Sequence, residues 1–291
     1  MCESCGCGDT NLVPVDVHDK ILSKNDLQAR HNREHFVEAG VLAINLMGSP
    51  GSGKTALLEA TSRALGGRLR LGAVSGDLAT DNDAQRLKKA GIPSEAITTG
   101  NACHLDAEMV HDSLHHMPWR ETDVFFIENV GNLVCPAVYD LGQAANVVAL
   151  AVTEGEDKPL KYPTMFRGAD LVVLTKTDLL PHLGDFSVQA LEDALARVMP
   201  TPRLLKVSAR TGEGIAEWVK WLEERRPKPG QRAAHSHEHT HAHEHEHAHD
   251  GQVHSHPHHH THAHEHGHDH GHDHQHAGEH GPHEHDHGRH G

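Results

Sequence analysis

The chain has 291 residues, a formal net charge of −15 at pH 7, 34 histidines and five cysteines. It shows no stretch of about 18 apolar residues, and no basic segment followed by an apolar run at its N-terminus. We therefore expect no transmembrane helix, no signal peptide and a cytoplasmic location in which thiols stay reduced. The charge over residues 1–234 is only −6 and forms no basic stripe, which argues against a nucleic-acid partner.

Residues 1–18 form a cysteine- and glycine-rich leader without hydrophobic periodicity. In reducing surroundings its thiols are better interpreted as metal ligands than as disulfides. Cys2, Cys5 and Cys7 lie within six residues and can close around one ion, for which soft thiolates favour Ni²⁺ or Zn²⁺. The alternative is a terminus whose cysteines are incidental. The polar residues 19–38 predict a helical segment.

A hydrophobic run at 41–47 predicts a buried strand, and residues 54–65 predict a helix. The residues between this strand and this helix, together with the first two residues of the helix, match the pattern G-x-x-x-x-G-K-S/T. They are Gly48, Ser49, Pro50, Gly51, Ser52, Gly53, Lys54 and Thr55. In this context backbone N–H groups and the helix N-terminus bind phosphate. Lys54 would reach the β- and γ-phosphates, and Thr55 would hold Mg²⁺. The alternative is a glycine-rich turn before an ordinary helix.

Beyond this loop, apolar runs alternate with helical stretches. We expect strands at 69–75, 123–128, 146–152, 170–175 and 203–208, and helices at 81–90, 104–117, 187–198 and 213–226. This alternation predicts an α/β fold over residues 39–226, whose mostly parallel sheet is covered by helices on both faces. With the Gly48–Thr55 pattern, it is the fold of a P-loop NTPase. Ligands of such folds bind at the carboxyl ends of the strands.

Carboxylates follow two of these strands. Glu128 and Gly131 resemble the D-x-x-G of G proteins with Glu in place of Asp, so Glu128 can hold Mg²⁺ or its water and Gly131 can donate to the γ-phosphate. Asp77 is the first candidate for a second group facing Mg²⁺ or water, and Asp83 is the next. Helix capping by Thr80 or Asp81 remains the alternative for this segment.

The strand at 170–175 leads into a segment that resembles the N-K-x-D guanine motif, with Thr175 at the Asn position. Asp178 can accept hydrogen bonds from the N1–H and the exocyclic amine of guanine, which adenine does not offer in the same way. Lys176 would lie over the base. Further on, a loop that resembles the S-A-K sequence behind guanine contains Ser208, Ala209 and Arg210.

Cys103 and His104 precede a predicted helix, and Cys135 follows Glu128 by seven residues. If Cys103 packs near Cys135, a site of two thiols and one imidazole forms beside the γ-phosphate sensor, which would couple metal affinity to the nucleotide state. Taken singly, Cys103 and Cys135 are equally well interpreted as small buried hydrophobic residues.

Residues 227–291 predict a linker and a disordered tail. From His235 to Gly291 the chain holds 26 of the 34 histidines and a charge of −9, with Val253 as its single large aliphatic residue. Such a segment cannot bury apolar surface. Its imidazoles suit several Ni, Cu, Zn or Co ions, released as the pH falls below about 6.5. The remaining histidines, such as His115 and His116, are interpreted as surface residues.

Together these motifs resemble the HypB family, the nickel-incorporation GTPases of nickel–iron hydrogenase maturation. The resemblance covers roughly residues 1–226 and rests on Cys2–Cys7, Gly48–Thr55, Gly76–Thr80, Cys103–Asp106, Glu128–Pro136 and Thr175–Leu179. In this family histidine-rich stretches store nickel and often lie near the N-terminus, so their C-terminal place here is a departure.

The resemblance implies a SIMIBI-class G domain that forms a nucleotide-dependent homodimer and uses GTP, GDP and Mg²⁺. It implies nickel at Cys2, Cys5 and Cys7, and nickel or zinc at Cys103, His104 and Cys135. The implied partners are a HypA-type zinc-containing chaperone, in some members SlyD, and the hydrogenase large-subunit precursor.

We therefore predict GTP-dependent nickel delivery, with Lys54, Asp77 and Glu128 as catalytic residues. Hydrolysis should be slow, because no arginine finger is identifiable. Three other functions stay open. A urease-maturation GTPase lacks the N-terminal thiol motif and normally carries Cys-Pro-His. A nickel storage protein would carry an incidental G domain. Asp178 argues against an ATP-dependent kinase.

Overall fold

The computed structural model describes residues 15–100, 102–227, 238–249 and 252–263. The leader cysteines Cys2, Cys5 and Cys7 lie outside these residues, so their prediction as nickel ligands stays untested by the fold. The chain divides into two units, Met1–Ala233 and Ala234–Gly291. Among the described residues, none of the helices combines the length and the apolar character that crossing a bilayer requires.

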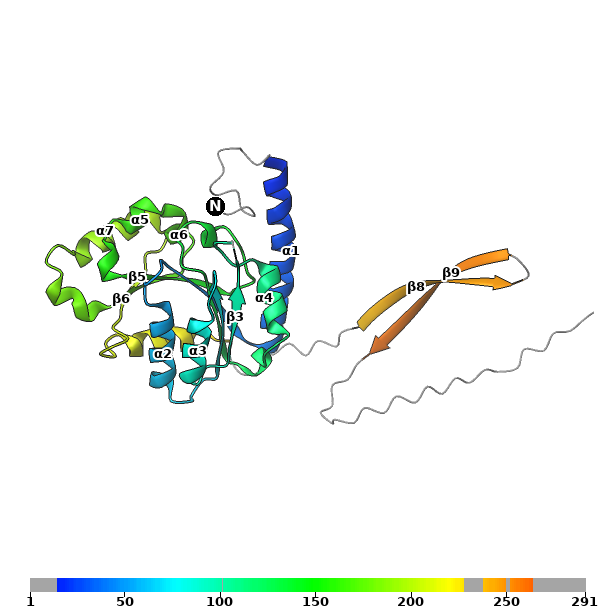
Figure 1. The fold of residues 1–291 in the computed structure, drawn as a ribbon, viewed down its shortest axis with the longest axis horizontal. Coiled ribbons are helices and arrows are strands. Elements are labelled where there is room, and N and C mark those ends of the chain that lie inside the picture. Colours follow the sequence, from blue (N-terminus) through cyan, green and yellow to red (C-terminus); the bar gives the residue numbers. More distant parts are fainter. Residues whose placement is uncertain (1–14, 101, 228–237, 250–251, 264–291) are drawn as a thin grey trace, which may run out of the picture. The chain divides into compact units, whose positions relative to one another are not determined.

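The first unit is built on a sheet of seven parallel strands (Figure 1). Their order across the sheet is β3-β2-β4-β1-β5-β6-β7. The strands are β1 Leu42–Met47, β2 Leu71–Asp77, β3 Ser94–Thr98, β4 Val124–Glu128, β5 Ala145–Ala151, β6 Leu171–Thr175 and β7 Leu204–Lys206. Because all seven strands are parallel, the loops that follow β1, β2 and β4 lie at the same carboxyl end of the sheet. Folds of this kind bind their ligands there.

Helices cover both faces of this sheet. They are α1 Val15–Ala39, α2 Lys54–Leu65, α3 Asn82–Lys89, α4 Ala107–Leu114, α5 Lys158–Lys161, α6 Pro163–Arg167, α7 Val188–Val198 and α8 Ile215–Arg225. Alternate strand residues point to opposite faces. Ile44 and Phe126 join the core under α2, α3 and α8, whereas Phe125 joins the core under α1 and α4. The α/β sheet covered on both faces is thereby confirmed.

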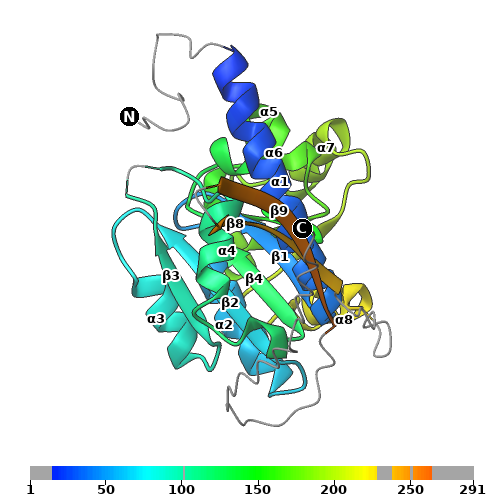
Figure 2. The ribbon, with the colours of Figure 1, turned by 90° about the vertical axis from the view of Figure 1, so that its right-hand side faces the viewer.

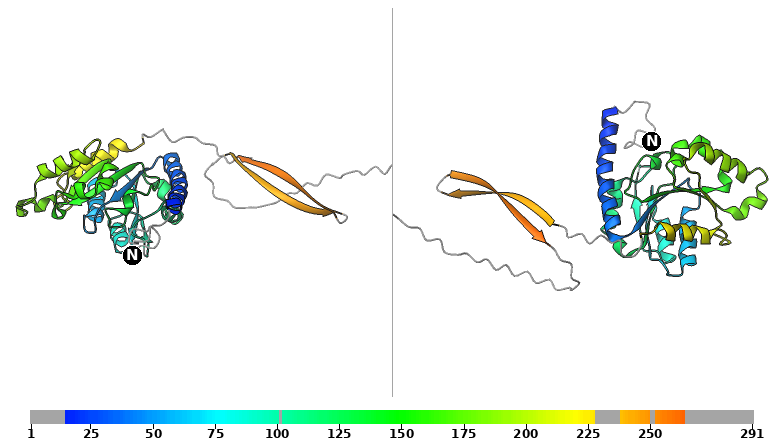
Figure 3. Two further views of the ribbon diagram at one scale, coloured as in Figure 1. Left: turned by 90° about the horizontal axis from the view of Figure 1, so that it is seen from above. Right: turned by 180° about the vertical axis from the view of Figure 1, so that it is seen from behind.

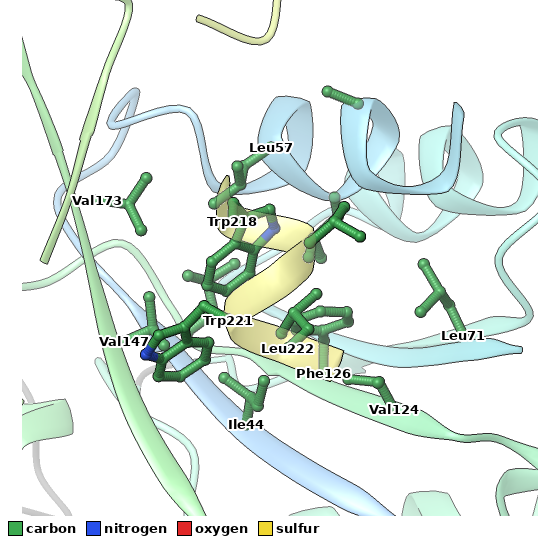
Figure 4. Packing of buried hydrophobic residues seen from close by; sticks show 14 of the residues in the cluster. Ile44, Leu57, Leu71, Val124, Phe126, Val147, Val173, Trp218, Trp221 and Leu222 are labelled. Atoms are coloured by element: carbon green, nitrogen blue, oxygen red, sulfur yellow. The ribbon is translucent and has the colours of Figure 1, made fainter. Parts of the chain in front are cut away.

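The face under α2 and α8 holds Trp218, the largest fully buried side chain among the described residues. Trp218 and Trp221 of α8 stack with their ring centroids 5.3 Å apart and lie against residues of the central strands (Figure 4). The buried indole of Trp218 has a polar partner, because its Nε1 donates to Thr61 Oγ1 of α2 at 2.8 Å. This packing fixes α2, the helix that follows the phosphate-binding pattern, against the sheet.

Helix α1, in blue, and helix α7, in yellow-green, lie at opposite ends of the unit (Figure 3). Helix α1 begins at Val15, so residues 15–18 belong to the helix rather than to the predicted leader. Two of its amides fix it against the domain. Asn25 donates to the carbonyl of Asp140 and accepts from the N–H of Ala107, and Asn32 is fully buried. The few apolar residues of this segment predicted a helix shorter than α1, because the side chains that fix α1 against the domain are polar.

Most predicted elements agree with the structure within three residues, and the differences have local causes. The prediction of a helix at 104–117 was too long, because Asp106 is the N-cap and accepts from the N–H of Met109 at 2.8 Å. Strand β3 was missed because its edge sequence, Ser-Glu-Ala-Ile-Thr, is mostly polar. Helices α5 and α6 were missed because each is about one turn long.

In the second unit the structure pairs β8, Glu238–His249, with β9, Gln252–Ala263, as an antiparallel hairpin. The predicted disorder of the tail is therefore not confirmed for these residues, and residues 264–291 lie outside the described part. Alternating residue types in both segments fit strands.

Candidate functional site

The phosphate-binding pattern lies between the carboxyl end of β1 and α2. Gly53 is the N-cap of α2 and has φ of 89°, a left-handed conformation that favours glycine. The hydroxyl of Ser52 is buried and has no hydrogen-bond partner among the described residues. A cavity of about 440 Å³ opens at this loop and is lined by Pro50, Gly51, Gly53, Lys54, Thr55, Gly76, Asp77, Asp83, Arg86, Glu128 and Gly131, among others. The loop, the helix N-terminus and the cavity together fit a phosphate chain.

Lys54 is hydrogen-bonded to the backbone of the phosphate-binding loop. Its Nζ donates to the carbonyl oxygens of Gly48 at 3.2 Å and Ser49 at 3.3 Å, and the side chain is buried. Burial lowers the pKa of Lys54, and the carboxylate of Glu128 partly opposes this effect. A buried cation with neutral partners is well placed to exchange them for phosphate oxygens.

Glu128 lies at the carboxyl end of β4 and is almost completely buried. It accepts hydrogen bonds from Thr55 Oγ1 at 2.7 Å and from Ser75 Oγ at 3.3 Å. Burial raises its pKa, and these hydrogen bonds and Lys54 act in the opposite direction. A hydroxyl and a carboxylate in contact at the cavity are the oxygen donors that Mg²⁺ uses beside phosphates, so the donor set fits this ion.

Asp77 lies at the end of β2 and lines the same cavity. Its carboxylate accepts from the N–H of Ala79 at 3.2 Å and from Thr80 Oγ1 at 2.9 Å. Against the raising effect of partial burial, these hydrogen bonds hold its pKa below the ordinary value. Asp81 is the N-cap of α3 but makes no capping bond with its side chain. Thr80 thus orients Asp77 rather than capping the helix.

Sequence reasoning missed Arg86, which also lines this cavity. It makes two hydrogen bonds of 3.0 Å to Glu59 and one of 3.1 Å to Asp83. Its spacing from Asp83 on a predicted helix was a signal that could have identified it. The second sequence candidate, Asp83, is therefore engaged with a cation on its own helix.

A second cavity, of about 400 Å³, adjoins the loop on its other side. Its lining includes Gly53, Thr175, Lys176, Asp178, Leu179, Ala209 and Arg210, which brings the two guanine-like segments together. Asp178 accepts from Ser208 Oγ at 2.7 Å and lies 3.7 Å from the guanidinium of Arg210. Lys176 has φ of 58°. The lining suits a flat base whose edge meets a carboxylate.

Thr175, the departure from the guanine motif, has a defined role in the structure. Its Oγ1 donates to the carbonyl of Ser52 at 2.6 Å, so it ties the base segment to the phosphate loop. A Cβ on Gly53 would lie 3.4 Å from the same hydroxyl. Thr175 therefore keeps the base segment and the phosphate loop in contact.

Cys103, His104 and Cys135 meet within one chain. Their ligand atoms all lie within 4.8 Å of one another, and the Sγ atoms are 3.0 Å apart, well beyond the ~2.05 Å of a disulfide bond. His104 is buried and stacks on Tyr139 with ring centroids 3.9 Å apart. Burial lowers the pKa of His104. Two thiols and an imidazole at this separation fit one ion such as Zn²⁺ or Ni²⁺.

Asn132 connects the phosphate loop to these thiols, and sequence reasoning did not identify it. Its N–H donates to the carbonyl of Gly48 at 3.2 Å, and its Nδ2 donates to the carbonyl of Cys103 at 3.3 Å. Beside it, Gly131 lies so close to Pro50 that a Cβ would approach the Pro50 nitrogen to 2.8 Å. One residue thus contacts both candidate sites.

Residues 42–205 match the family described as CobW/HypB/UreG, nucleotide-binding domain. Among curated proteins, the hydrogenase maturation factor HypB of Azotobacter vinelandii is 52% identical over 210 residues, which span 72% of this chain and 69% of the relative. The HypB of Escherichia coli strain K12 is 45% identical over 221 residues, 76% of this chain and 75% of the relative.

Two solved structures resemble the chain closely. HypB from Helicobacter pylori in complex with nickel superposes with a TM-score of 0.67 and 37% identity, covering 74% of this chain and all of the other. The hydrogenase maturation factor HypB from Archaeoglobus fulgidus gives 0.65 and 39%, covering 70% and 98%.

Proposed function

This chain belongs to the HypB hydrogenase maturation factors, within the CobW/HypB/UreG nucleotide-binding proteins, and we propose that it is a slow GTPase that gates nickel delivery to the hydrogenase large-subunit precursor. The observation that carries this proposal is a pair of hydrogen bonds made by Asn132. They join the phosphate loop at Gly48 to Cys103 of the thiolate site, which consists of Cys103, His104 and Cys135. A nucleotide at one site and a metal at the other would act on the same residue.

In this proposal GTP binds with its phosphates in the Gly48–Thr55 loop and its base against Asp178. Lys54 then exchanges the carbonyls of Gly48 and Ser49 for the β- and γ-phosphates. Thr55, Glu128 and Asp77 would hold Mg²⁺, which supplies charge neutralisation between the β- and γ-phosphates. The hydrogen bonds from Ala79 and Thr80 keep Asp77 ionised and oriented toward the cavity for this role.

Nickel is the cargo, held by Cys103, His104 and Cys135, and Zn²⁺ can compete for the same donors. When Lys54 leaves the carbonyl of Gly48, that carbonyl loses one of the two hydrogen bonds it accepts, the other coming from the N–H of Asn132. The N–H of Gly131 would bind the γ-phosphate beside it. Both changes shift Asn132, and Cys103 with it, relative to Cys135. Hydrolysis reverses the shift and changes nickel affinity.

The other parts of the proposal rest on the family. They are a nucleotide-dependent homodimer, a HypA-type chaperone or SlyD as partners, nickel at Cys2, Cys5 and Cys7, and storage of nickel by the histidine-rich tail. The cytoplasmic location remains a prediction. Two relatives, from Helicobacter hepaticus and Helicobacter pylori, carry the name hydrogenase/urease maturation factor, so urease maturation is the alternative closest to the proposal.

Delivery and storage make different predictions for the tail. In cells that lack their own HypB factor, the chain without residues 231–291 should restore hydrogenase activity at ample nickel, because the G domain and thiolate site are intact. At limiting nickel it should restore less, since the tail's imidazoles are gone. Hydrogenase activity at two nickel concentrations is the measurement.

The matched comparison is full-length Cys135→Ala, which keeps the tail and loses one donor of the thiolate site. It should fail at limiting nickel and recover only in part at ample nickel. Full restoration by Cys135→Ala together with failure of the shortened chain would contradict delivery and favour storage.

A further inference from the structure

Helix α1 packs beside α4 (Figure 2). Four histidines meet between these helices, outside the nucleotide and thiolate sites. His31 and His35 lie four residues apart on α1, and His111 and His115 lie four residues apart on α4. On a helix this spacing places both side chains on one face. The two helices thus bring a pair of imidazoles each to a common seam.

The imidazoles are close enough to bind a single ion. The Nε2 atoms of His31 and His35 are 3.0 Å apart, and those of His111 and His115 are 3.3 Å apart. One ligand nitrogen from each of His31, His35 and His111 lies within 4.8 Å of the others. Two nitrogens bound at about 2.0 to 2.1 Å to one cation stand roughly 3 Å apart, which is the separation found here.

Asn32 fixes the tautomer of His111. The Nδ2 group of this buried amide donates to the carbonyls of Ala107 at 2.8 Å and Leu141 at 3.2 Å, so its Oδ1 must be the acceptor. Oδ1 lies 3.1 Å from His111 Nδ1, which therefore carries the hydrogen. Nε2 of His111 is left with its lone pair on the side of His115. Metal-binding histidines are held by partners of this kind on their other nitrogen.

The surroundings also favour neutral imidazoles. Burial, and then the neighbouring His31, lower the pKa of His35, and burial, and then His115, lower the pKa of His111. On the other ring nitrogen of His35, Nδ1 lies 3.9 Å from a carboxylate oxygen of Glu38. In each pair of neutral rings one Nε2 can donate a hydrogen bond to the other. A ring whose hydrogen lies on Nδ1 instead presents the lone pair of its Nε2 to a cation.

We propose that His31, His35 and His111, with His115 as a fourth available imidazole, form a binding site for one borderline divalent cation of the Ni²⁺, Cu²⁺ and Zn²⁺ group. The cation would link α1 to α4, at the seam where Asn25, Asn32 and Arg33 already hold α1 to the domain. This site is additional to the gated nickel site proposed above and does not depend on it.

The test measures how fast diethyl pyrocarbonate modifies each histidine of the full chain, by mass spectrometry of its peptides. Ni²⁺ alone is the probe, in molar excess over the 34 histidines so that the tail does not deplete it. At free Ni²⁺ ten times the dissociation constant, modification of His31, His35 and His111 should slow about tenfold, because about one site in eleven stays empty. The exposed His182, outside the cluster, is the reference within the same digest.

Variants separate the cluster from ordinary surface binding. The change His31→Ala with His35→Ala should remove the protection of His111, whereas the matched control His116→Ala, on an exposed histidine beside α4, should leave it intact. Unslowed modification of His31 and His111 in the native chain would overturn the proposal, and so would protection of His111 that survives the double variant.

A third variant distinguishes this site from the thiolate site. In Cys103→Ala the protection of His31, His35 and His111 should persist at its full extent. Its loss there would assign the effect to nickel at Cys103, His104 and Cys135 and would overturn a separate site between α1 and α4. Protection that persists in Cys103→Ala, together with a native chain that does not restore hydrogenase activity in cells lacking their own HypB factor, would leave the α1–α4 site standing while the delivery proposal fails.

Discussion

Replacing Lys54 by Ala should abolish measurable binding of GTP and GDP and, with it, hydrolysis. The side chain is buried at the floor of the phosphate loop, and its Nζ has only the carbonyls of Gly48 and Ser49 as hydrogen-bond partners among the described residues. Losing one partner of a desolvated charge pair costs about 2 to 5 kcal/mol, or roughly 30- to several thousand-fold in affinity. Titration with a fluorescent guanine nucleotide and release of phosphate are the measurements.

The matched control is Lys220→Ala on α8, whose exposed ammonium lies 3.8 Å from Glu224 four residues on. Exposed pairs of this kind contribute about 0.3 to 0.5 kcal/mol, so binding should not change measurably. Circular dichroism should show both variants folded, because the hydrogen bonds that the structure shows for Lys54 go to carbonyls of its own loop. Retained GTPase activity in folded Lys54→Ala would contradict the role assigned to this residue.

Replacing Asp178 by Asn should change which base the protein accepts. The carboxylate can accept two hydrogen bonds from guanine, whereas the amide presents a donor to the exocyclic amine of guanine and leaves it unpaired. Sites built to hydrogen-bond a substrate group discriminate by about 10⁴ or more, so we expect GTP affinity to fall by roughly 10³-fold or further. Xanthosine triphosphate, which carries an oxygen in place of that amine, should bind the variant better than GTP does.

The fold should survive this change, because the hydroxyl of Ser208 can accept from an amide as readily as it donates to the carboxylate at 2.7 Å. The control is Asp157→Asn, an exposed residue paired with Lys161 one turn later. The native chain should prefer GTP to ATP by a factor similar to that lost in the variant. Equal GTP affinity of Asp178→Asn and the native chain would rule out base recognition by Asp178.

The fold and both ligand-binding loops could be predicted from the sequence because their signals are local. The loop from Gly48 to Thr55 is a fixed pattern between a strand and a helix, and Asp178 follows an apolar run that could only be a strand. Cys103 and Cys135 were harder, since their meeting depends on loops that follow different strands. The structure places their Sγ atoms 3.0 Å apart, which meets the condition on which the metal hypothesis depends. Their function as a metal site stays a proposal.

What the sequence could not show depends on packing between distant segments. Asn132 reaches Gly48 and Cys103 across 84 and 29 positions, through one backbone and one side-chain hydrogen bond, and no periodicity predicts such contacts. The same holds for the histidines of α1 and α4. His115 is exposed, as expected, and its contact with His111 lies within one helical turn. The approach of His111 to His31, in contrast, follows from a helix crossing fixed by Asn25 and Asn32.

The nickel affinity of the thiolate site in two nucleotide states shows whether nucleotide and metal binding are coupled. The measurement uses a chain without residues 231–291 in which Cys2, Cys5 and Cys7 are changed to Ala, saturated with GDP or with a non-hydrolysable GTP analogue. We expect nickel affinities that differ by about fivefold or more between the two nucleotide states. The change Cys103→Ala should abolish this difference. Equal affinities would contradict the proposed nickel gating, because the contacts of Asn132 would then carry no coupling between nucleotide and metal.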